Sequence, residues 1–288
     1  MGRKEQRIKK RLEKNPVKEL NKIQNRYSSP LFWKFAHTED PRHSSYITYT
    51  NRMMLGTLYY KGIAGIDSMQ EMTEQFNDET VSKNLSMFIG EKAGEYVPHH
   101  VTENEYLERL DPMELEEIKQ DCETKAFLRL AGRIKKRFPR LPILLLADSL
   151  YASKTVMDLC REYKWEFLIR YKKGSIPSIM GEYEKIPEKM AETGRKRWKI
   201  ENEGFNRQKN WQGSITHTCS WNDQAQKNHY LMAQISDFMK QLYEYYYLRK
   251  NGIEKKQKNI SSDLLESFGQ QITKEDIFSV DENTQSFN

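Results

Sequence analysis

A short apolar run bounded by proline is the feature that most constrains the fold of this chain. Pro142 is followed by five apolar residues, 143–147, and the run ends at Asp148. A continuous apolar run of this length predicts a β-strand that is buried on both faces. A carboxylate after such a strand lies at the carboxyl edge of the sheet, where ligand and metal sites of open α/β sheets collect. Asp148 would also cap the next helix well, so this position alone leaves both interpretations open.

The segments around this strand predict a strand–helix–strand unit. Residues 119–137 have the spacing of an amphipathic helix, and residues 152–164 predict a second helix. Large apolar residues alternate with charged ones in residues 165–171, as in a strand. Two strands joined by a helix of this length predict a parallel crossover and therefore an α/β fold.

A second acidic position lies on a predicted helix at residues 196–210. Arg197 precedes Glu201 by four residues and Lys209 follows it by eight, so the three side chains share one side of the helix. This arrangement is unusual for a solvated surface. It fits a carboxylate that holds a divalent metal between cations that hold phosphates.

The N-terminal region is strongly basic. Residues 1–22 contain nine lysine and arginine residues against three glutamates, and this surplus equals the net charge of +6 of the whole chain. Such an arm suits a polyanion such as DNA, although a solvated basic helix without a partner fits as well. Asn15 and Pro16 predict the cap and first residue of a helix. The nine cations are Arg3, Lys4, Arg7, Lys9, Lys10, Arg11, Lys14, Lys18 and Lys22.

The remaining chain predicts mostly helices and a polar end. Residues 29–110 have helical spacing, and residues 226–249 predict a long helix. The tail from Lys250 onward is polar, with one short helix around Leu264 and Phe268. Three sparse cysteines fit reducing cytosol, and no apolar run reaches the ~18 residues of a membrane span. We therefore expect a soluble intracellular protein.

Two segments resemble those that carry catalytic carboxylates in DDE transposases of bacterial insertion sequences. Residues 145–151 resemble the strand of the second aspartate, and residues 197–206 resemble the glutamate helix. In one large group of this family the helix carries a Tyr–Arg–Glu–Lys signature, to which Arg197 and Glu201 correspond.

The rest of that signature departs from the family pattern. Gly194 stands where the tyrosine is expected, and Gln208 stands where the lysine is expected, with Lys209 one residue later. The resemblance therefore implies the metal-binding role of Glu201 more directly than it implies the phosphate-contacting role of Lys209.

The resemblance implies an RNase-H-like core and metal-dependent phosphoryl transfer. Asp148 and Glu201 would be catalytic ligands of Mg²⁺ or Mn²⁺, in a reaction that cleaves and joins DNA. The implied partners are transposon ends and target DNA, with a possible homo-oligomer on DNA, at the nucleoid of the bacterial cytoplasm. The expected DNA contacts are Arg197, Lys199, Arg207, Lys209, Arg3, Lys4, Arg7, Lys9, Lys10 and Arg11.

The predicted organisation has four parts. These are a basic arm (1–28), a helical DNA-binding region (29–118), a partial RNase-H-like core of later strands and helices (119–249) and a polar tail (250–288). In the family, the first aspartate lies on three antiparallel strands before the helix that begins here near Lys119. No such β-rich stretch is visible, and an internal deletion between Ile118 and Lys119 would explain its absence.

The missing aspartate leaves enzymatic activity open. Asp111 or Asp121 would have to replace it, but both are interpreted as helix-start residues. Two other functions fit the chain: a non-catalytic DNA-binding remnant that represses transposition, and an unrelated RNase-H-like metal-dependent nuclease.

Three further motifs have two interpretations each. The pair at residues 99–100 is either a metal-binding pair of histidines or a turn before a helix, and His217 with Cys219 is either a ligand pair or core packing. The tyrosines of residues 243–247 either stack on bases or pack against helices or an oligomer partner.

Overall fold

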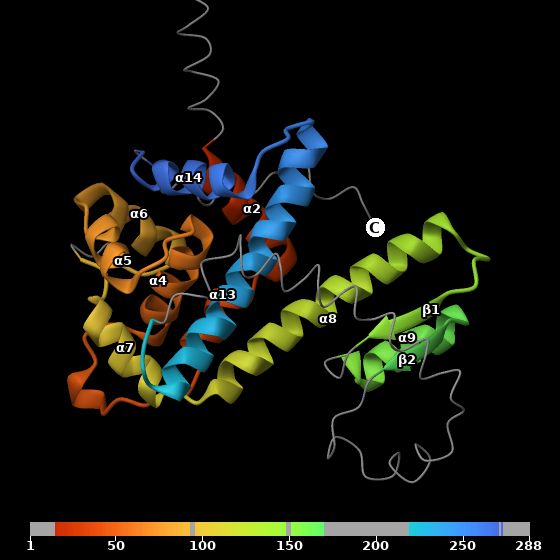
Figure 1. The fold of residues 1–288 in the computed structure, drawn as a ribbon, viewed down its shortest axis with the longest axis horizontal. Helices are drawn as coiled ribbons and strands as arrows, with labels where there is room; N and C mark the ends of the chain where they lie inside the picture. Colours follow the sequence, from red (N-terminus) through yellow and green to blue (C-terminus); the bar gives the residue numbers. More distant parts are fainter. Residues whose placement is uncertain (1–14, 93–95, 148–150, 170–218, 271, 273–288) are drawn as a thin grey trace, which may run out of the picture. The chain divides into compact units, whose positions relative to one another are not determined.

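The computed structural model describes residues 15–92, 96–147, 151–169, 219–270 and 272. The chain forms two compact units, which we call the helical unit (Met1–Lys119 with Lys209–Asn288) and the sheet unit (Gln120–Gln208). In Figure 1 the ribbon colours follow the sequence, and the blue C-terminal helices lie in the same unit as the red and orange N-terminal ones.

Helices make up the described part of the helical unit. The predicted cap is confirmed, because the Asn15 side chain accepts hydrogen bonds from the backbone N–H groups of Val17 and Lys18 ahead of Pro16. The predominantly helical character of residues 29–110 is also confirmed. The helices are α2 (Pro16–Ser28), α3 (Leu31–Ala36), η1 (Ser44–Tyr46), α4 (Asn51–Ala64), α5 (Met69–Phe76), α6 (Glu79–Ile89), α7 (His100–Arg109), α13 (Asp223–Tyr243), η3 (Glu244–Leu248), η4 (Arg249–Asn251) and α14 (Gln257–Phe268).

Helix α4 is the centre of this unit. All of its residues except Arg52 and Gly62 are buried, because α3, α6, α13 and α14 pack around it. The Thr50 side chain caps its first turn, and Gly65 ends it with a φ of 68°, a conformation that favours glycine. A helix that is apolar on every side is expected in the interior of a helical domain.

Gly62 allows α4 and α13 to approach closely. A β-carbon at this position would lie 2.5 Å from Ser236 Oγ and 2.6 Å from Ser236 Cβ. The Ser236 hydroxyl is within hydrogen-bonding distance, 2.9 Å, of the carbonyl oxygen of Tyr59 on α4. The contact between the two helices therefore depends on the absence of a side chain at residue 62.

Replacing Gly62 with alanine is expected to destabilise the helical unit by about 1–3 kcal/mol, because α13 has to move away. The gain in helix propensity, about 1 kcal/mol, offsets part of this cost. Gly132 on α8 is the matched control, since the nearest atom to its added β-carbon is Tyr163 Oη at 3.9 Å. Gly132→Ala should be neutral or stabilising in urea denaturation, and equal effects of the two changes would contradict the packing.

Helix α14 completes the core that the N-terminal helices begin. Its predicted position is confirmed, and its Leu264 and Phe268 side chains are fully buried. The ring of Phe268 lies 5.2 Å from that of Tyr60 and 6.2 Å from that of Phe88. The Asn15 amide also donates to the carbonyl oxygen of Ser267 at 3.2 Å, which joins the first described residue to this helix.

The sheet unit contains a two-stranded parallel sheet. It is built from the later part of α8 (Pro112–Arg137), β1 (Leu144–Ala147), α9 (Lys154–Tyr163) and β2 (Glu166–Ile169). The strands pair from Leu144 opposite Glu166 to Ala147 opposite Ile169, which confirms the predicted parallel pairing. The apolar cluster of this unit consists of Phe127, Ala131, Val156, Cys160 and Trp165.

Two predictions about these elements are wrong. The strand was expected to be buried on both faces, but the Leu144 side chain is 44% exposed. Its neighbours in the sequence, Ile143 and Leu145, pack against the apolar cluster instead. The helix expected to begin near Lys119 begins at Pro112. The acidic segment before Lys119 has high helix propensity, so nothing interrupts the helix there.

The fold class is therefore mostly helical with a small parallel sheet, consistent with an α/β arrangement. Among the helices of the described ranges, none combines the length and the apolar character needed to cross a membrane.

Candidate catalytic edge

The carboxyl ends of β1 and β2 meet at one edge of the sheet. Ala147, the last residue of β1, is buried and pairs with Ile169, the last residue of β2. Asp148 is the next residue of the chain after β1, although Asp148 itself lies outside the described residues. The parallel pairing of β1 and β2 is the arrangement that the prediction of a site at this edge requires.

Helix α9 is capped by Ser153 and not by Asp148. The Ser153 side chain accepts a hydrogen bond from the backbone N–H of Val156, and Ser153 has extended backbone angles, as an N-cap residue should. The interpretation of Asp148 as the cap of this helix is therefore wrong. Its second interpretation, as a site residue, stays a prediction.

The cluster beneath this edge is structural. Tyr151 lies edge-on to Phe127, with ring centroids 5.6 Å apart, and Val156 and Cys160 are fully buried. Burial raises the pKa of the Cys160 thiol, so it stays protonated near neutral pH. Cys160 therefore contributes packing and is not suited to act as a nucleophile.

The other predicted site residues lie outside the described residues. For these positions the structure neither brings the side chains together nor separates them. They are Glu201, Arg197, Lys199, Arg207, Lys209, Arg3, Lys4, Arg7, Lys9, Lys10 and Arg11, together with His217 of the possible ligand pair.

The two candidate replacement carboxylates have structural roles. Asp111 accepts a hydrogen bond from the backbone N–H of Met113 at 2.9 Å, so it caps α8 as predicted. Asp121 does not start a helix, because α8 begins nine residues earlier at Pro112; it pairs with Lys125 at 2.8 Å. Within the described ranges, no group of three or more histidine, cysteine, aspartate or glutamate side chains could hold a metal ion.

The paired histidines belong to the start of a helix. His99 caps α7 by accepting from the backbone N–H of Val101, and the backbone N–H of His100 donates to Thr73 Oγ1 at 3.0 Å. The interpretation of this pair as a turn before a helix is confirmed.

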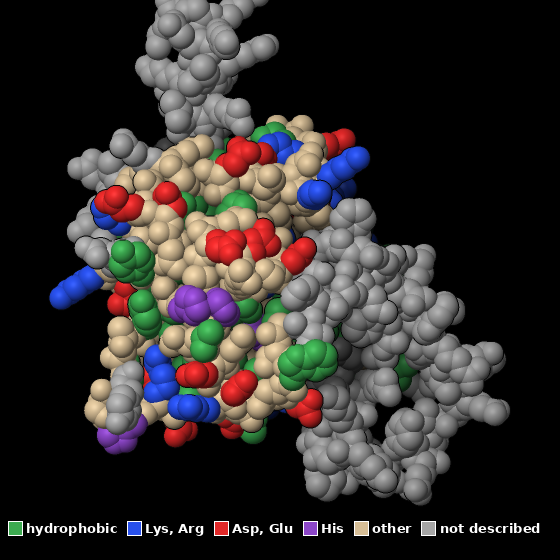
Figure 2. Space-filling model, turned by 60° about the vertical axis from the view of Figure 1, so that its left-hand side comes forward, with side chains coloured by type: hydrophobic (Ala, Val, Ile, Leu, Met, Phe, Trp, Pro, Cys, Tyr) green, Lys and Arg blue, Asp and Glu red, His purple; other side chains and the backbone are tan. Residues whose placement is uncertain are grey.

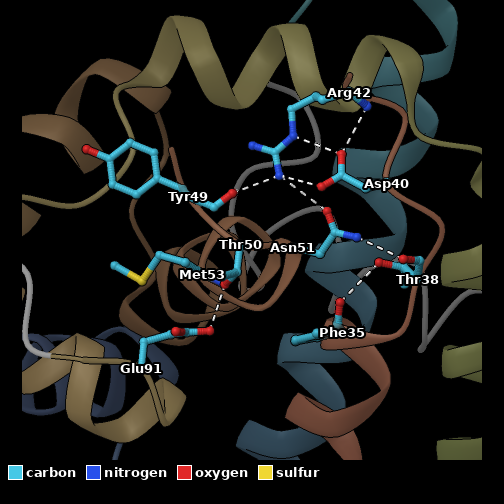
Figure 3. Close-up of polar contacts among 9 residues, drawn as sticks. All are labelled: Phe35, Thr38, Asp40, Arg42, Tyr49, Thr50, Asn51, Met53 and Glu91. Carbon is cyan, nitrogen blue, oxygen red and sulfur yellow. Dashed lines mark hydrogen bonds and ion pairs between the residues drawn. The ribbon is translucent and has the colours of Figure 1, made fainter. Parts of the chain in front are cut away.

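The structure also contains a partly buried polar cluster that sequence reasoning missed (Figure 3). Arg42 forms a double hydrogen bond with Asp40, at 2.9 and 2.8 Å, and donates to the carbonyl oxygen of Tyr49 at 2.8 Å. The Asn51 amide donates to the carbonyl oxygen of Thr38 at 2.8 Å. These contacts fix the loop between α3 and α4 against the start of α4.

Glu103 is buried next to this cluster. It is fully buried on α7, and neither carboxylate oxygen has a hydrogen-bond partner among the described residues. Burial raises its pKa well above the usual value, and the nearby Arg42 opposes this increase. The sequence places Glu103 in an acidic first turn, which is the pattern of a solvated residue, so no sequence signal indicated its burial.

His229 on α13 is a second buried ionisable group. Burial, with a smaller contribution from Lys61, lowers its pKa to about 3. Its Nε2 lies 3.0 Å from the side-chain oxygen of Asn104, so this nitrogen carries the hydrogen of the neutral ring. The Lys61 ammonium is buried as well and donates to the carbonyl oxygens of Ile66 and Asp67.

The face of the helical unit around α5, α6 and α7 carries charges of both signs (Figure 2). Acidic side chains outnumber basic ones among the exposed charged residues of these helices, so this face offers no continuous basic field that would attract a polyanion. The exposed charged residues of these helices are Glu74, Glu79, Lys83, Glu105, Glu108 and Arg109.

Comparison with known proteins finds a family match in the part of the chain that contains the sheet unit. Residues 119–236 match the family model described as the transposase DDE domain. No curated protein and no solved structure matches the chain. The matched residues include the strand that precedes Asp148 and the positions of Asp148 and Glu201. Residues 119–236 of this chain are therefore similar to the DDE domain of transposases.

Proposed function

We propose that this chain is a DNA transposase of an insertion sequence that binds DNA and is impaired in catalysis. The observation that carries the proposal is the match to the transposase DDE domain over residues 119–236. This range includes both carboxylates that the sequence analysis selected, and β1 ends immediately before the first of them.

In this proposal Asp148 and Glu201 hold a divalent cation, Mg²⁺ or Mn²⁺. The metal would polarise phosphate oxygens and activate the attacking oxygen. Arg197 and Lys209, with Lys199 and Arg207, would hold the DNA phosphates beside Glu201. Carboxylates with phosphate and water oxygens form the donor set that Mg²⁺ prefers, so the residue types fit this cation.

The catalytic defect follows from the region before β1. In the described ranges 15–92 and 96–143 every regular element is a helix, so none of them supplies the three strands that carry the first aspartate in this family. This supports an RNase-H-like core that has lost its early strands through a deletion between Ile118 and Lys119. Asp111 already caps α8, and Asp121 already pairs with Lys125.

Purified protein is expected to show no Mg²⁺-dependent cleavage or joining of its element's DNA ends, because two carboxylates hold the metals weakly. The measurement uses labelled DNA that carries terminal inverted repeats, which are first sought in the sequence on either side of the gene, with Mg²⁺ or Mn²⁺. Asp148→Ala should give the same background level as the unchanged chain. Strand transfer that disappears in Asp148→Ala would overturn the proposed defect and reveal a replacement carboxylate.

The absence of strands before β1 in the described residues favours a second candidate function. The chain would bind the element's ends without cutting them and repress transposition by an intact enzyme. This function predicts binding to the inverted repeats with a steep dependence on salt concentration. In both cases we propose that the chain acts on DNA at the bacterial nucleoid, as an oligomer assembled on the transposon ends.

A further inference from the structure

A π-helical turn divides the tyrosine run at the end of α13 into two groups. Helix α13 continues after Tyr243 into η3, a π-helix whose wider turns are frequent at functional sites. Tyr243 and Tyr247 stack with ring centroids 5.3 Å apart, and Tyr243 is only 3% exposed. This pair supports the interpretation of helix packing for one half of the run.

The other half of the run faces α2. Tyr246 stacks on Tyr27, with ring centroids 4.2 Å apart and planes 23° from parallel. Tyr245 lies edge-on to Tyr246 and is 47% exposed. An aromatic platform that reaches solvent therefore joins the end of α2 to η3, two segments that are far apart in the sequence.

Two cations border this platform. The Arg26 guanidinium lies 5.5 Å from the centre of the Tyr27 ring, and the Lys250 ammonium lies 5.5 Å from the centre of the Tyr246 ring. Both residues are exposed, and neither forms an ion pair with another described residue. Nearby carboxylates are already paired: Glu19 contacts Lys22 at 3.2 Å, and Glu244 contacts Arg249 at 2.9 Å.

The charge of this region continues along the chain. Residues 244–258 contain five lysine and arginine residues and two glutamates, and of these cations Arg249 pairs with Glu244 and Lys255 pairs with Asp263. The face around α5, α6 and α7, in contrast, mixes both signs (Figure 2). Excess positive charge attracts phosphates, and exposed aromatic rings provide flat surfaces for sugars and bases.

We propose that Arg26, Lys250 and Tyr245, arranged around the Tyr27–Tyr246 stack, form a DNA-contact surface on the helical unit. The inference rests on the proposed function, since it assumes that the chain binds DNA. The two cations contact backbone phosphates on either side of the stack, and Tyr245 packs against the sugar–phosphate backbone. The surface is independent of Asp148 and Glu201, so it binds DNA whether or not the chain is catalytically competent.

The test compares the binding of a fluorescein-labelled DNA duplex by the full chain and by the double variant Arg26→Gln/Lys250→Gln. Fluorescence anisotropy is measured over a range of salt concentrations. Each lost phosphate contact lowers the magnitude of the slope of log K against log salt concentration by about 0.9, where K is the DNA association constant. The slope of the double variant should therefore be smaller in magnitude by about 1.8. Its affinity should fall on the order of ten-fold or more at about 0.1 M salt.

A matched double variant, Lys83→Gln/Arg109→Gln, removes the same charge from the mixed-sign face and should leave the slope unchanged. Tyr245→Ala should weaken binding several-fold while Tyr245→Phe retains it, because the ring and not the hydroxyl makes the contact. Circular dichroism melts establish that the variants are folded.

Two outcomes separate this inference from the proposed function. If the unchanged chain binds DNA and Arg26→Gln/Lys250→Gln binds equally well, the surface inference is wrong and the proposed function stands. If the unchanged chain binds no duplex even at about 50 mM salt, the proposed DNA-binding function fails, and the surface inference fails with it. A change in the oligomeric state of the double variant without loss of DNA binding would assign the surface to self-association and overturn the inference.

Discussion

Replacing Phe268 with alanine is expected to lower the free energy of unfolding of the helical unit by about 3–5 kcal/mol. The side chain is fully buried, and its ring contacts the rings of Tyr60, Phe76 and Phe88. Truncation leaves a cavity among three aromatic residues that are themselves held by α4, α5 and α6. The measurement is urea denaturation of the full chain, monitored by circular dichroism.

The control for this change is Phe138→Ala. Phe138 is 47% exposed and follows α8 in the sheet unit, so its truncation should cost less than about 1 kcal/mol. A loss below 1 kcal/mol for Phe268→Ala as well would show that α14 does not complete the core of the helical unit.

Acidification is expected to destabilise the helical unit through His229. Its pKa is lowered to about 3 in the folded chain, from an ordinary value of 6.5, so the unfolded chain binds the proton more readily. Stability from this group is therefore fully present above pH 6.5 and is lost as the pH falls toward 3. The difference is about 5 kcal/mol. Urea denaturation at several pH values, on the unchanged chain and on His229→Gln, measures it.

Glu103 provides a control with the opposite sign. Its pKa is raised in the folded chain, so its contribution is complete below the ordinary value of 4.5 and is lost as the pH rises through the folded pKa. The stability of Glu103→Gln relative to the unchanged chain should increase as the pH rises. The stability of His229→Gln relative to the unchanged chain should increase as the pH falls. Parallel pH profiles for the unchanged chain and His229→Gln would refute the assignment of a buried neutral histidine.

Local sequence signals predicted the elements well because their causes are local. Asn15 and Pro16 mark the start of α2, and the alternation after Trp165 marks β2. Parallel pairing followed from the length of the helix between the two strands. The exposure of Leu144 could not be predicted in this way, since burial depends on which elements cover each face of the sheet.

The candidate site was less accessible to sequence reasoning. The resemblance selected Asp148 and Glu201, and the family match covers both positions. It could not select Glu103 or Arg42, because their environment is created by segments from α3 to α7 that meet only in the folded chain. Burial of an acidic residue leaves no local pattern, and its sequence neighbours suggest a solvated helix start.

The hydrogen bond between Asn15 and Ser267 spans almost the whole chain and has a consequence for synthesis on the ribosome. The apolar faces of α4 and α6 emerge long before α13 and α14, which cover them, have been translated. At about 5–20 residues per second, this interval is on the order of ten seconds or more. During that time the nascent chain exposes a surface that chaperones would bind, and a ribosome that stalls before residue 257 releases a product without its closing helix.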